Sequence, residues 1–295
     1  MNEQDIRDKQ VWGPNANILV VRADDSDARD WMASSAIALS LLNFGIAHCG
    51  IMDVGYPFEV VRVRQAGAFF FACYEGEGQV LIEGKWRTIG CGDACVQPPF
   101  IPNVLKARKE KRWKFCWVRF QPASKSTARV SLHTPAVAAF DSQAIRHAIQ
   151  GLSVEAAGAT SPTALTKWAD LINWYFTSFS KPLSHSPQLA YLWGQVERSL
   201  CEPWTLDELA RIAEISKEHL RRLCTQTLGR SPMQHVAFLR MCRAAELLQT
   251  SDTSIAEIAT QVGYANQFSF SDTFKRIHGC RPSTLRQGKL LKRDW

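Results

Sequence analysis

The sequence lacks the features of a membrane or secreted protein. No uninterrupted apolar run approaches the roughly 20 residues that a membrane-spanning helix needs. The segment from Met1 to Asp5 is polar and acidic, and it does not resemble a secretory signal peptide. We therefore expect a soluble, cytoplasmic protein without a membrane partner.

Closely spaced metal ligands are lacking as well. The nine cysteines show no Cys-x-x-Cys spacing, and their odd number does not fit a disulfide framework. Cys91 and Cys95 form the one close pair, and no His-rich motif accompanies them. The seven histidines are scattered, and His-x-His does not occur. We expect reduced thiols, no metal site and no cofactor.

The chain does have enough apolar residues for two ordinary domains. Of its 295 residues, 46% are hydrophobic, too many for a disordered chain. The formal net charge is +7 and the pI is near 9.0. Excess positive charge suits a polyanionic partner such as DNA, although charge alone is weak evidence.

A motif near the C-terminus occurs twice. Residues 205–210 read Thr-Leu-Asp-Glu-Leu-Ala, and residues 254–259 read Ser-Ile-Ala-Glu-Ile-Ala. Each copy begins with a capping box, a Ser or Thr followed three residues later by Glu, which predicts the start of a helix. Each copy is the first helix of a predicted helix-turn-helix unit. Two units in tandem present two helices to two segments of major groove.

The ends of the other C-terminal helices are also encoded locally. Ser216 and Asn266 stand where the second helix of each unit needs an N-cap. Gly229 and Gly279 stand where these helices end, since glycine accepts the left-handed conformation of a helix terminus. A further capping box at Ser231 predicts a helix that runs to about residue 250 and joins the two units.

The second helix of the first unit exposes groups that can read bases. Glu218, Arg221 and Arg222 lie on the face left free when the apolar residues pack inward. Arginine donates two hydrogen bonds to guanine, and glutamate accepts one from cytosine. A charged helix face is often merely solvated, but the helix-turn-helix context favours base recognition.

The second unit exposes a less basic set, Gln267, Phe268, Ser269 and Asp272. Glutamine can pair with adenine through two hydrogen bonds, and a phenylalanine ring can pack on a thymine methyl group. Asp272 stands where the repeat places Arg222, and a carboxylate there repels phosphate unless it accepts from a cytosine. The second unit is therefore either more selective or weaker than the first.

Residues 204–210 (WTLDELA), 216–223 (SKEHLRRL), 229–235 (GRSPMQH) and 255–276 resemble the AraC/XylS family of bacterial transcription regulators. The resemblance covers about the last 95 residues. It implies double-stranded DNA as a partner, RNA polymerase as a candidate partner, and no enzyme activity. It also implies that the seven exposed residues named for the two units contact bases. The family usually has arginine at position 272 and phenylalanine at 224, so Asp272 and Cys224 are departures.

The first half predicts an antiparallel sandwich or barrel. Short apolar runs at 69–74, 79–82, 86–89, 94–96 and 113–120 are separated by turn residues, among them 75–78 and 83–84. Three segments, 76–84, 92–99 and 117–120, are similar to the cupin-like sensor domain of the same family. Metal-binding cupins often carry histidine where this chain has Asn103.

The resemblance also suggests a ligand site inside the barrel. In sugar-sensing relatives, a tryptophan that matches Trp117 stacks on the ligand. We expect Arg62, Asn103, Phe115 and Trp117 to line the lumen and to bind a neutral carbohydrate or similar effector. The alternative is that Phe115 and Trp117 belong to an ordinary barrel core.

Residues 161–179 predict a helix with one broad apolar stripe centred on Trp168, Ile172 and Phe176. The stripe can pack on its own barrel or pair with a second copy, and the family resemblance favours a homodimer. The predicted organisation is an effector-binding domain (1–160), a dimerisation helix and linker (161–185) and a DNA-binding domain (186–295).

The predicted fold class is therefore α+β with two domains, a cupin-like antiparallel β-barrel with a linker helix and an all-α double helix-turn-helix. The leading functional hypothesis is a transcription regulator that senses a sugar or sugar-like molecule and controls carbohydrate-metabolism genes. One alternative is a cupin enzyme fused to a DNA-targeting module. The other is a DNA-binding regulator without an effector.

Overall fold

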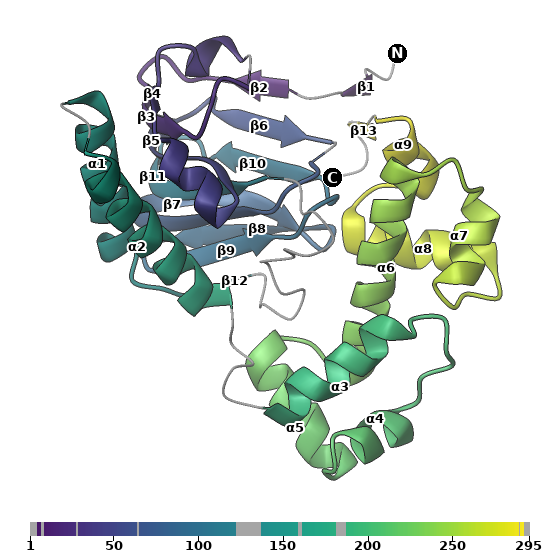
Figure 1. The fold of residues 1–295 in the computed structure, drawn as a ribbon. Coiled ribbons are helices and arrows are strands. Elements are labelled where there is room, and N and C mark those ends of the chain that lie inside the picture. The colour runs from purple at the N-terminus through teal and green to yellow at the C-terminus, as the bar shows by residue number, and fades with distance from the viewer. Residues whose placement is uncertain are drawn as a thin grey trace.

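A computed structural model describes residues 5–6, 9–27, 29–63, 65–121, 137–158, 161–180, 187–288 and 290–291. The first half forms a strongly curved antiparallel sheet with two helices on its outer side, and the second half is helical (Figure 1). This confirms the predicted fold class. No helix within the described ranges is both long and apolar enough to cross a membrane.

The strands form one curved sheet with two halves. One half contains β3, β5, β11, β7 and β9, the other contains β2, β6, β10, β7 and β8, and β7 belongs to both. The strands are β2 (Lys9–Val11), β3 (Asn17–Arg22), β4 (Ala36–Ile37), β5 (Ile46–Gly55), β6 (Glu59–Arg62), β7 (Phe69–Ile82), β8 (Lys85–Gly90), β9 (Asp93–Gln97), β10 (Asn103–Ala107), β11 (Arg112–Phe120) and β12 (Val137–Ala139). A separate short pair joins β1 (Asp5–Ile6) to β13 (Leu290–Leu291).

The predicted turn at 75–78 is wrong, because β7 runs through it as a single strand. Gly76 has φ of 73°, and a β-carbon on it would lie 2.0 Å from the Arg112 carbonyl oxygen. A β-carbon on Gly78 would lie 2.1 Å from the Trp113 ring. The glycines therefore let the strand bend over β11 and pass from one half of the sheet to the other. The predicted turn at 83–84 is present, with Glu83 and Gly84 both at positive φ.

Alternate residues of the strands face two different cores, as the period of two requires. The inner core contains large side chains from both halves, among them Met52, Val54, Phe58, Phe71, Val80, Leu105, Trp113, Phe115 and Trp117. The outer face of the half that contains β3, β5 and β11 contributes Val21, Cys49, Phe70, Ala72, Cys116 and Val118 to a second core.

Helices α1 (Gln143–Ala157) and α2 (Pro162–Ser180) cover that outer face. The apolar stripe of α2 is buried there, with Ile172 and Phe176 inaccessible and the Phe176 ring 4.2 Å from that of Phe120. The stripe therefore packs on its own barrel. The prediction that a second copy covers this stripe is wrong, because the same apolar spacing suits either partner and the chain's own sheet occupies it.

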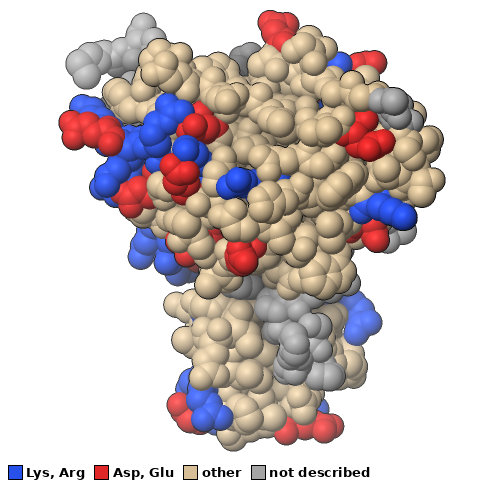
Figure 2. All heavy atoms as spheres, turned by 90° about the vertical axis from the view of Figure 1, so that its left-hand side faces the viewer, with Lys and Arg blue, Asp and Glu red and all other residues tan. Residues whose placement is uncertain are grey.

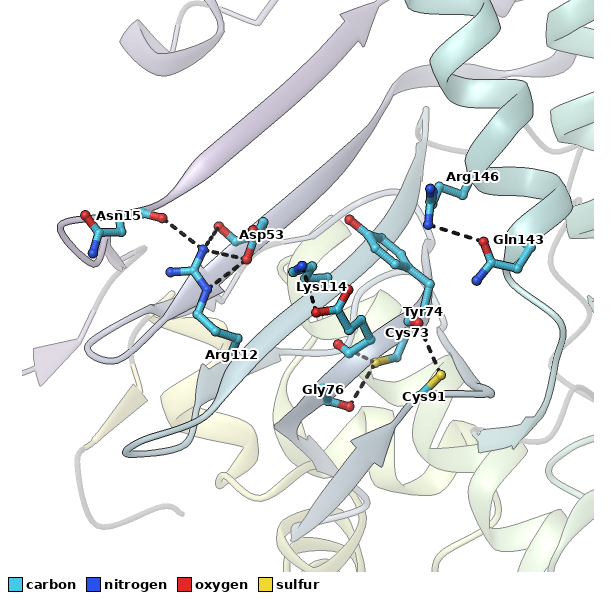
Figure 3. A network of polar contacts seen from close by, with 11 residues as sticks. Asn15, Asp53, Cys73, Tyr74, Gly76, Cys91, Arg112, Lys114, Gln143 and Arg146 are labelled. Atoms are coloured by element: carbon cyan, nitrogen blue, oxygen red, sulfur yellow. Dashed lines mark hydrogen bonds and ion pairs between the residues drawn. The ribbon is translucent and has the colours of Figure 1, made fainter.

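Polar contacts join the strands near the first turn of α1 (Figure 3). Arg112 on β11 donates to Asp53 Oδ1 on β5, from Nε at 2.9 Å and from Nη2 at 2.5 Å, and also to the Asn15 carbonyl at 3.1 Å. Lys114 pairs with Glu75 across β11 and β7 at 2.7 Å. Side chains at 53 and 114 point away from the inner core, so this network holds the strands without entering the lumen.

The helical half contains two similar units around one long helix. They are formed by α3 (Pro187–Arg198), α4 (Leu206–Ile212), α5 (Lys217–Leu228), α6 (Pro232–Thr250), α7 (Ile255–Gln261), α8 (Gln267–His278) and α9 (Pro282–Arg286). The three predicted capping boxes are present at the starts of α4, α6 and α7. Gly229 and Gly279 end α5 and α8 with φ of 69° and 76°. The predicted linker lies almost entirely in residues 181–186, outside the described residues.

The outer face of the β6 and β10 half packs against the helical domain. Val61, Leu81 and Val104 share one apolar cluster with side chains of α3 to α9. Arg230 Nη2 donates to Glu83 Oε1 at 2.5 Å, and Gln249 Nε2 donates to the Phe100 carbonyl. Figure 1 shows α6 and α9 beside this edge of the sheet. The two domains therefore share a packed interface.

Candidate nucleic-acid interface and internal cavity

The first candidate reading surface is the exposed face of α5. The Ser216 side chain accepts from the His219 amide at 3.2 Å, which caps the helix start. Leu220 and Cys224 are buried against the rest of the unit, so Cys224 fills a packing position. Glu218, Arg221 and Arg222 are exposed, as are Lys217 and Thr225. Arg221 Nη1 lies 3.3 Å from Glu218 Oε2, and an ion pair this exposed can exchange for a base or phosphate contact.

The second candidate surface is the equivalent face of α8. Asn266 caps the helix by accepting from the Phe268 amide at 2.8 Å, while Phe270 and Phe274 are buried. Gln267, Ser269 and Asp272 are exposed, and Phe268 is 82% exposed. A phenylalanine left this exposed is costly in water, and contact with a base edge or a thymine methyl group would bury it.

All seven residues predicted to contact DNA therefore lie in solvent on the second helices of the two units. Both helices pack on α6, which lies between the units in Figure 1. Lys275 and Arg276 are exposed on α8 beside Asp272, so the second helix also carries groups that can neutralise phosphate. Two such helices on one domain are the elements with which tandem helix-turn-helix units enter successive major-groove segments, about 34 Å apart.

A cavity of about 410 Å³ lies on the inner side of the curved sheet. The four residues predicted to line the lumen, Arg62, Asn103, Phe115 and Trp117, all lie on its wall. Arg62 and Asn103 are cross-strand partners on β6 and β10, and Phe115 and Trp117 are alternate residues of β11. The inner core fills the rest of the lumen, so the barrel is solid at one end and hollow at the other.

A row of three polar residues crosses one wall of the cavity. Arg22 on β3 is the register partner of His48 on β5, which is in turn the partner of Arg119 on β11. Because neighbouring strands lie about 4.8 Å apart, the two arginine backbones are on the order of 10 Å apart with the imidazole between them. Arg29 Nη2 lies 3.3 Å from His48 Nε2 and supplies a further guanidinium to this wall.

The electrostatic environment keeps His48 neutral. Burial, followed by the Arg29 and Arg119 charges, lowers the pKa of His48 to about 3, against a smaller opposing effect of Asp27. The neutral ring accepts the Arg29 hydrogen bond at Nε2 and so carries its proton on Nδ1. This wall of the cavity is therefore electropositive, with an uncharged imidazole at its centre.

An aromatic wall lies beside the polar row. The Trp117 ring lies 5.2 Å from the His48 ring, 6.2 Å from Phe69 and 6.4 Å from Trp31. Gly50 on β5 leaves room for it, since a β-carbon there would lie 2.9 Å from the indole. The cavity thus combines aromatic faces with a charged row.

The sequence reasoning missed Arg22, Arg29, His48, Gln65 and Arg119, which also line the cavity. For Arg119 a signal existed, because a strand period of two from Phe115 and Trp117 puts position 119 on the same face. Arg22 and His48 carry no such local signal. Their place depends on the register between β3, β5 and β11.

The close pair of cysteines is split between two environments. Cys95 is buried in the inner core, while Cys91 is exposed and its thiol donates to the Tyr74 carbonyl at 3.1 Å. Within the described ranges, three or more His, Cys, Asp or Glu side chains do not come together as a metal site.

Comparisons with known proteins agree with this geometry. A family model described as a helix-turn-helix domain matches residues 209–288, which span α5 to α9. The MmsAB operon regulatory protein of Pseudomonas aeruginosa is 28% identical over 240 residues, which are 77% of this chain and 77% of that protein. The raffinose operon transcriptional regulatory protein RafR of Pediococcus pentosaceus is 24% identical over 270 residues, 87% of this chain and 96% of that protein.

One solved structure is similar to the helical half. It is a transcriptional regulator of Chromobacterium violaceum described among AraC-type DNA-binding domain-containing proteins. It is 30% identical and covers 35% of this chain and 93% of that chain, with a TM-score of 0.34. The two operon regulators, by contrast, are similar over both halves of this chain.

Proposed function

We propose that this chain is a DNA-binding transcription regulator of the AraC type, and that its DNA binding responds to a small-molecule effector held in the N-terminal cavity. The seven exposed residues of α5 and α8 read the bases of the operator. The cavity residues Arg62, Asn103, Phe115 and Trp117 contact the effector. The protein acts as a switch and catalyses no reaction.

The position of β6 and β10 carries this proposal. Arg62 and Asn103 face the cavity, whereas Val61 and Val104, their neighbours along the strands, belong to the apolar cluster shared with the helical domain. A ligand that moves Arg62 or Asn103 therefore moves a strand that the DNA-binding domain packs on. Coupling of this kind needs an element with two arrangements that both sites bias.

The effector class predicted from the sequence is a sugar or sugar-like molecule, with carbohydrate-metabolism genes as targets. Two observations support it. RafR is named for a raffinose operon, and the Trp117 indole lines the cavity, where an aromatic ring suits the C–H face of a sugar.

The test has two steps. DNA duplexes are first enriched from a randomised library on the full-length chain, and a metabolite library is screened for compounds that raise its melting temperature. Each stabilising compound is then added to the enriched duplex. We expect at least one to change the affinity for DNA several-fold. If stabilising compounds bind and the DNA affinity does not change, the protein is a regulator without an effector response.

The rival hypothesis of a cupin enzyme is tested by metal analysis. The purified chain is expected to contain no stoichiometric metal. Stoichiometric iron, manganese or zinc that is lost together with an activity on adding a chelator would favour the enzyme.

A further inference from the structure

We propose that the effector of this cavity is a small organic acid, whose carboxylate lies among the arginines while its body lies on the aromatic wall. The inference rests on the proposed effector function of the cavity and replaces the neutral carbohydrate by a charged ligand. Charge, unsatisfied donors and shape each support it.

The cavity has a surplus of positive charge. Arg22, Arg29, Arg62 and Arg119 line it, against the carboxylates of Asp24 and Asp27. Asp27 is already engaged, because it accepts from Arg29 Nε at 2.7 Å and pairs with the same guanidinium at Nη2. The Arg22 side chain is only 9% exposed, and its Nη2 pairs with the exposed Asp25 carboxylate at 2.8 Å. Counting Asp25 as well, four arginines face three aspartates, so one positive charge remains in excess. Guanidinium groups removed from water are stabilised when an anion is placed beside them.

The unsatisfied polar atoms of the wall are mostly donors. Arg22 Nε, Trp31 Nε1, Gln65 Nε2 and Trp117 Nε1 are buried and have no hydrogen-bond partner within the described part of the chain. Asn103 Oδ1 is the one unsatisfied acceptor among the lining side chains of those residues. A buried donor without a partner costs free energy. A carboxylate, which only accepts, matches this set better than hydroxyl groups, each of which also donates.

The row Arg22, His48, Arg119 gives the carboxylate a place. Two guanidiniums, on β3 and β11, flank the imidazole on β5 between them. A carboxylate can accept from both sides of such a row, and Arg groups bind planar carboxylates through two parallel hydrogen bonds. Burial is the largest cause of the lowered pKa of His48, and the Arg29 and Arg119 charges add to it, which is the part that an anion would offset.

The rest of the cavity suits the uncharged part of the ligand. Met52, Phe58, Leu105 and Phe115 line the side away from the row, next to the Trp117 ring. A volume of about 410 Å³ is at the small end of ligand pockets, which span about 300–1,000 Å³. The ligand is therefore a compact acid, either a sugar acid or an acid with a small ring or branched chain.

The test compares acids with neutral molecules of the same shape on the full-length chain. The pairs are glucuronate and glucose, benzoate and benzyl alcohol, and isobutyrate and isobutanol, each at constant ionic strength and measured by thermal shift and calorimetry. Inorganic phosphate is a separate arm. We expect one acid to bind at least tenfold more tightly than its neutral partner, and more weakly as the salt concentration rises.

Two charge-removing variants locate the site. Arg119→Gln and Arg62→Gln should each weaken binding of that acid at least tenfold. Arg108→Gln is the control, because Arg108 is an exposed partner of Glu77 outside the cavity. In the wild-type chain, NMR should show a higher pKa of His48 with the acid bound than without it. A variant that is only destabilised would not show this change.

Each other outcome counts against the inference. If a neutral compound binds as tightly as its acid, the ligand is not an acid, and the effector function stands. If phosphate binds as tightly as the acids, the arginines form a general anion site. If none of these acids binds the folded chain, the acid is wrong, whereas the effector function fails only if the metabolite library also gives no ligand. Retained binding in Arg119→Gln and Arg62→Gln would place the carboxylate elsewhere.

Discussion

A substitution at Arg221 tests base recognition most directly. It is exposed on α5 and tied only to Glu218, so replacing it should not disturb the fold. Arg221→Ala should cost about 1–3 kcal/mol of DNA binding and relax the preference at one base position, because a bidentate base contact is lost. Fluorescence anisotropy on the enriched duplex and on single-base variants of it measures both effects.

A matched control exists in the same domain. Arg243 on α6 is also exposed and pairs with a glutamate three residues later, Glu246. Arg243→Ala removes the same charge and the same kind of ion pair, and should leave the base preference unchanged. If both variants lost the same DNA affinity, Arg221 would contribute only general electrostatic attraction to DNA.

Two buried histidines predict how stability depends on pH. Burial lowers the pKa of His48 to about 3, with Arg29, Arg119 and Arg62 adding to the effect and Asp27 opposing it. Burial also lowers the pKa of His278 to about 4, opposed by its hydrogen bond to the Met241 carbonyl. Above pH 6.5 neither the folded nor the unfolded chain protonates these rings. Below it the unfolded chain binds protons that the folded chain cannot.

The free energy of unfolding should therefore fall as the pH drops from 6.5 toward 4, by about 2 kcal/mol for each histidine at pH 5. Urea unfolding at pH 7.5 and pH 5.0, followed by tryptophan fluorescence, measures the loss. His48→Gln should reduce it, whereas His219→Gln, at an exposed position on α5, should not. An unchanged loss in His48→Gln would show that the ring is protonated in the folded state.

At the scale of elements, the outer side of α1 and α2 is the surface that we expect to bind a second copy. Trp174 is 58% exposed and Val154 is 75% exposed. Figure 2 faces this side of the molecule, and much of its upper part carries neither Lys or Arg nor Asp or Glu. We expect a homodimer through this surface, because water exposure of a large indole favours its burial.

Trp174→Glu should convert the dimer to a monomer at micromolar concentration without unfolding the domain, and sedimentation velocity measures the change. Tyr191→Glu is the control, since Tyr191 on α3 is 59% exposed but lies in the other domain. Substituting Ile172 or Phe176 is not informative about association, because both are buried in the chain's own core. A monomeric wild-type chain would contradict this surface.

The elements differ in how well the sequence predicts them. Helix ends in the DNA-binding half depend on local groups such as Thr205, Ser254 and Gly279, so both units and their exposed faces were predictable. The sequence predicts the apolar face of α2. It does not predict which surface buries that face, because apolar spacing is the same for either partner. Four cavity residues were predicted, whereas the charged row depends on strand register, which local patterns do not fix.

For the whole molecule, the turn between β7 and β8 connects the two domains. Glu83 binds Arg230 just before α6, and a β-carbon on the neighbouring Gly84 would lie 2.7 Å from the Arg276 carbonyl oxygen at the end of α8. One turn of the barrel therefore contacts both helix-turn-helix units. These contacts join residues far apart in the chain, so no local sequence pattern predicts them.

Glu83→Ala should weaken the coupling between ligand and DNA, because it removes the partner of a buried guanidinium and loosens the interface. The expected result is a smaller change in DNA affinity on adding ligand, with ligand affinity itself altered less than threefold. The ratio of DNA affinities with and without ligand measures it. Glu77→Ala, which removes an exposed ion pair on β7, is the control. An unchanged ratio would exclude this turn from the coupling.

Strands β6 and β10 have a consequence for how such a regulator can diversify. Positions 62 and 103 face the cavity, while positions 61 and 104 face the DNA-binding domain. Substitutions at the first pair can therefore alter which molecule is recognised while the second pair keeps the domains docked. A new ligand specificity can then evolve without a new domain interface. Tolerance to substitution should therefore alternate from one residue to the next along these two strands.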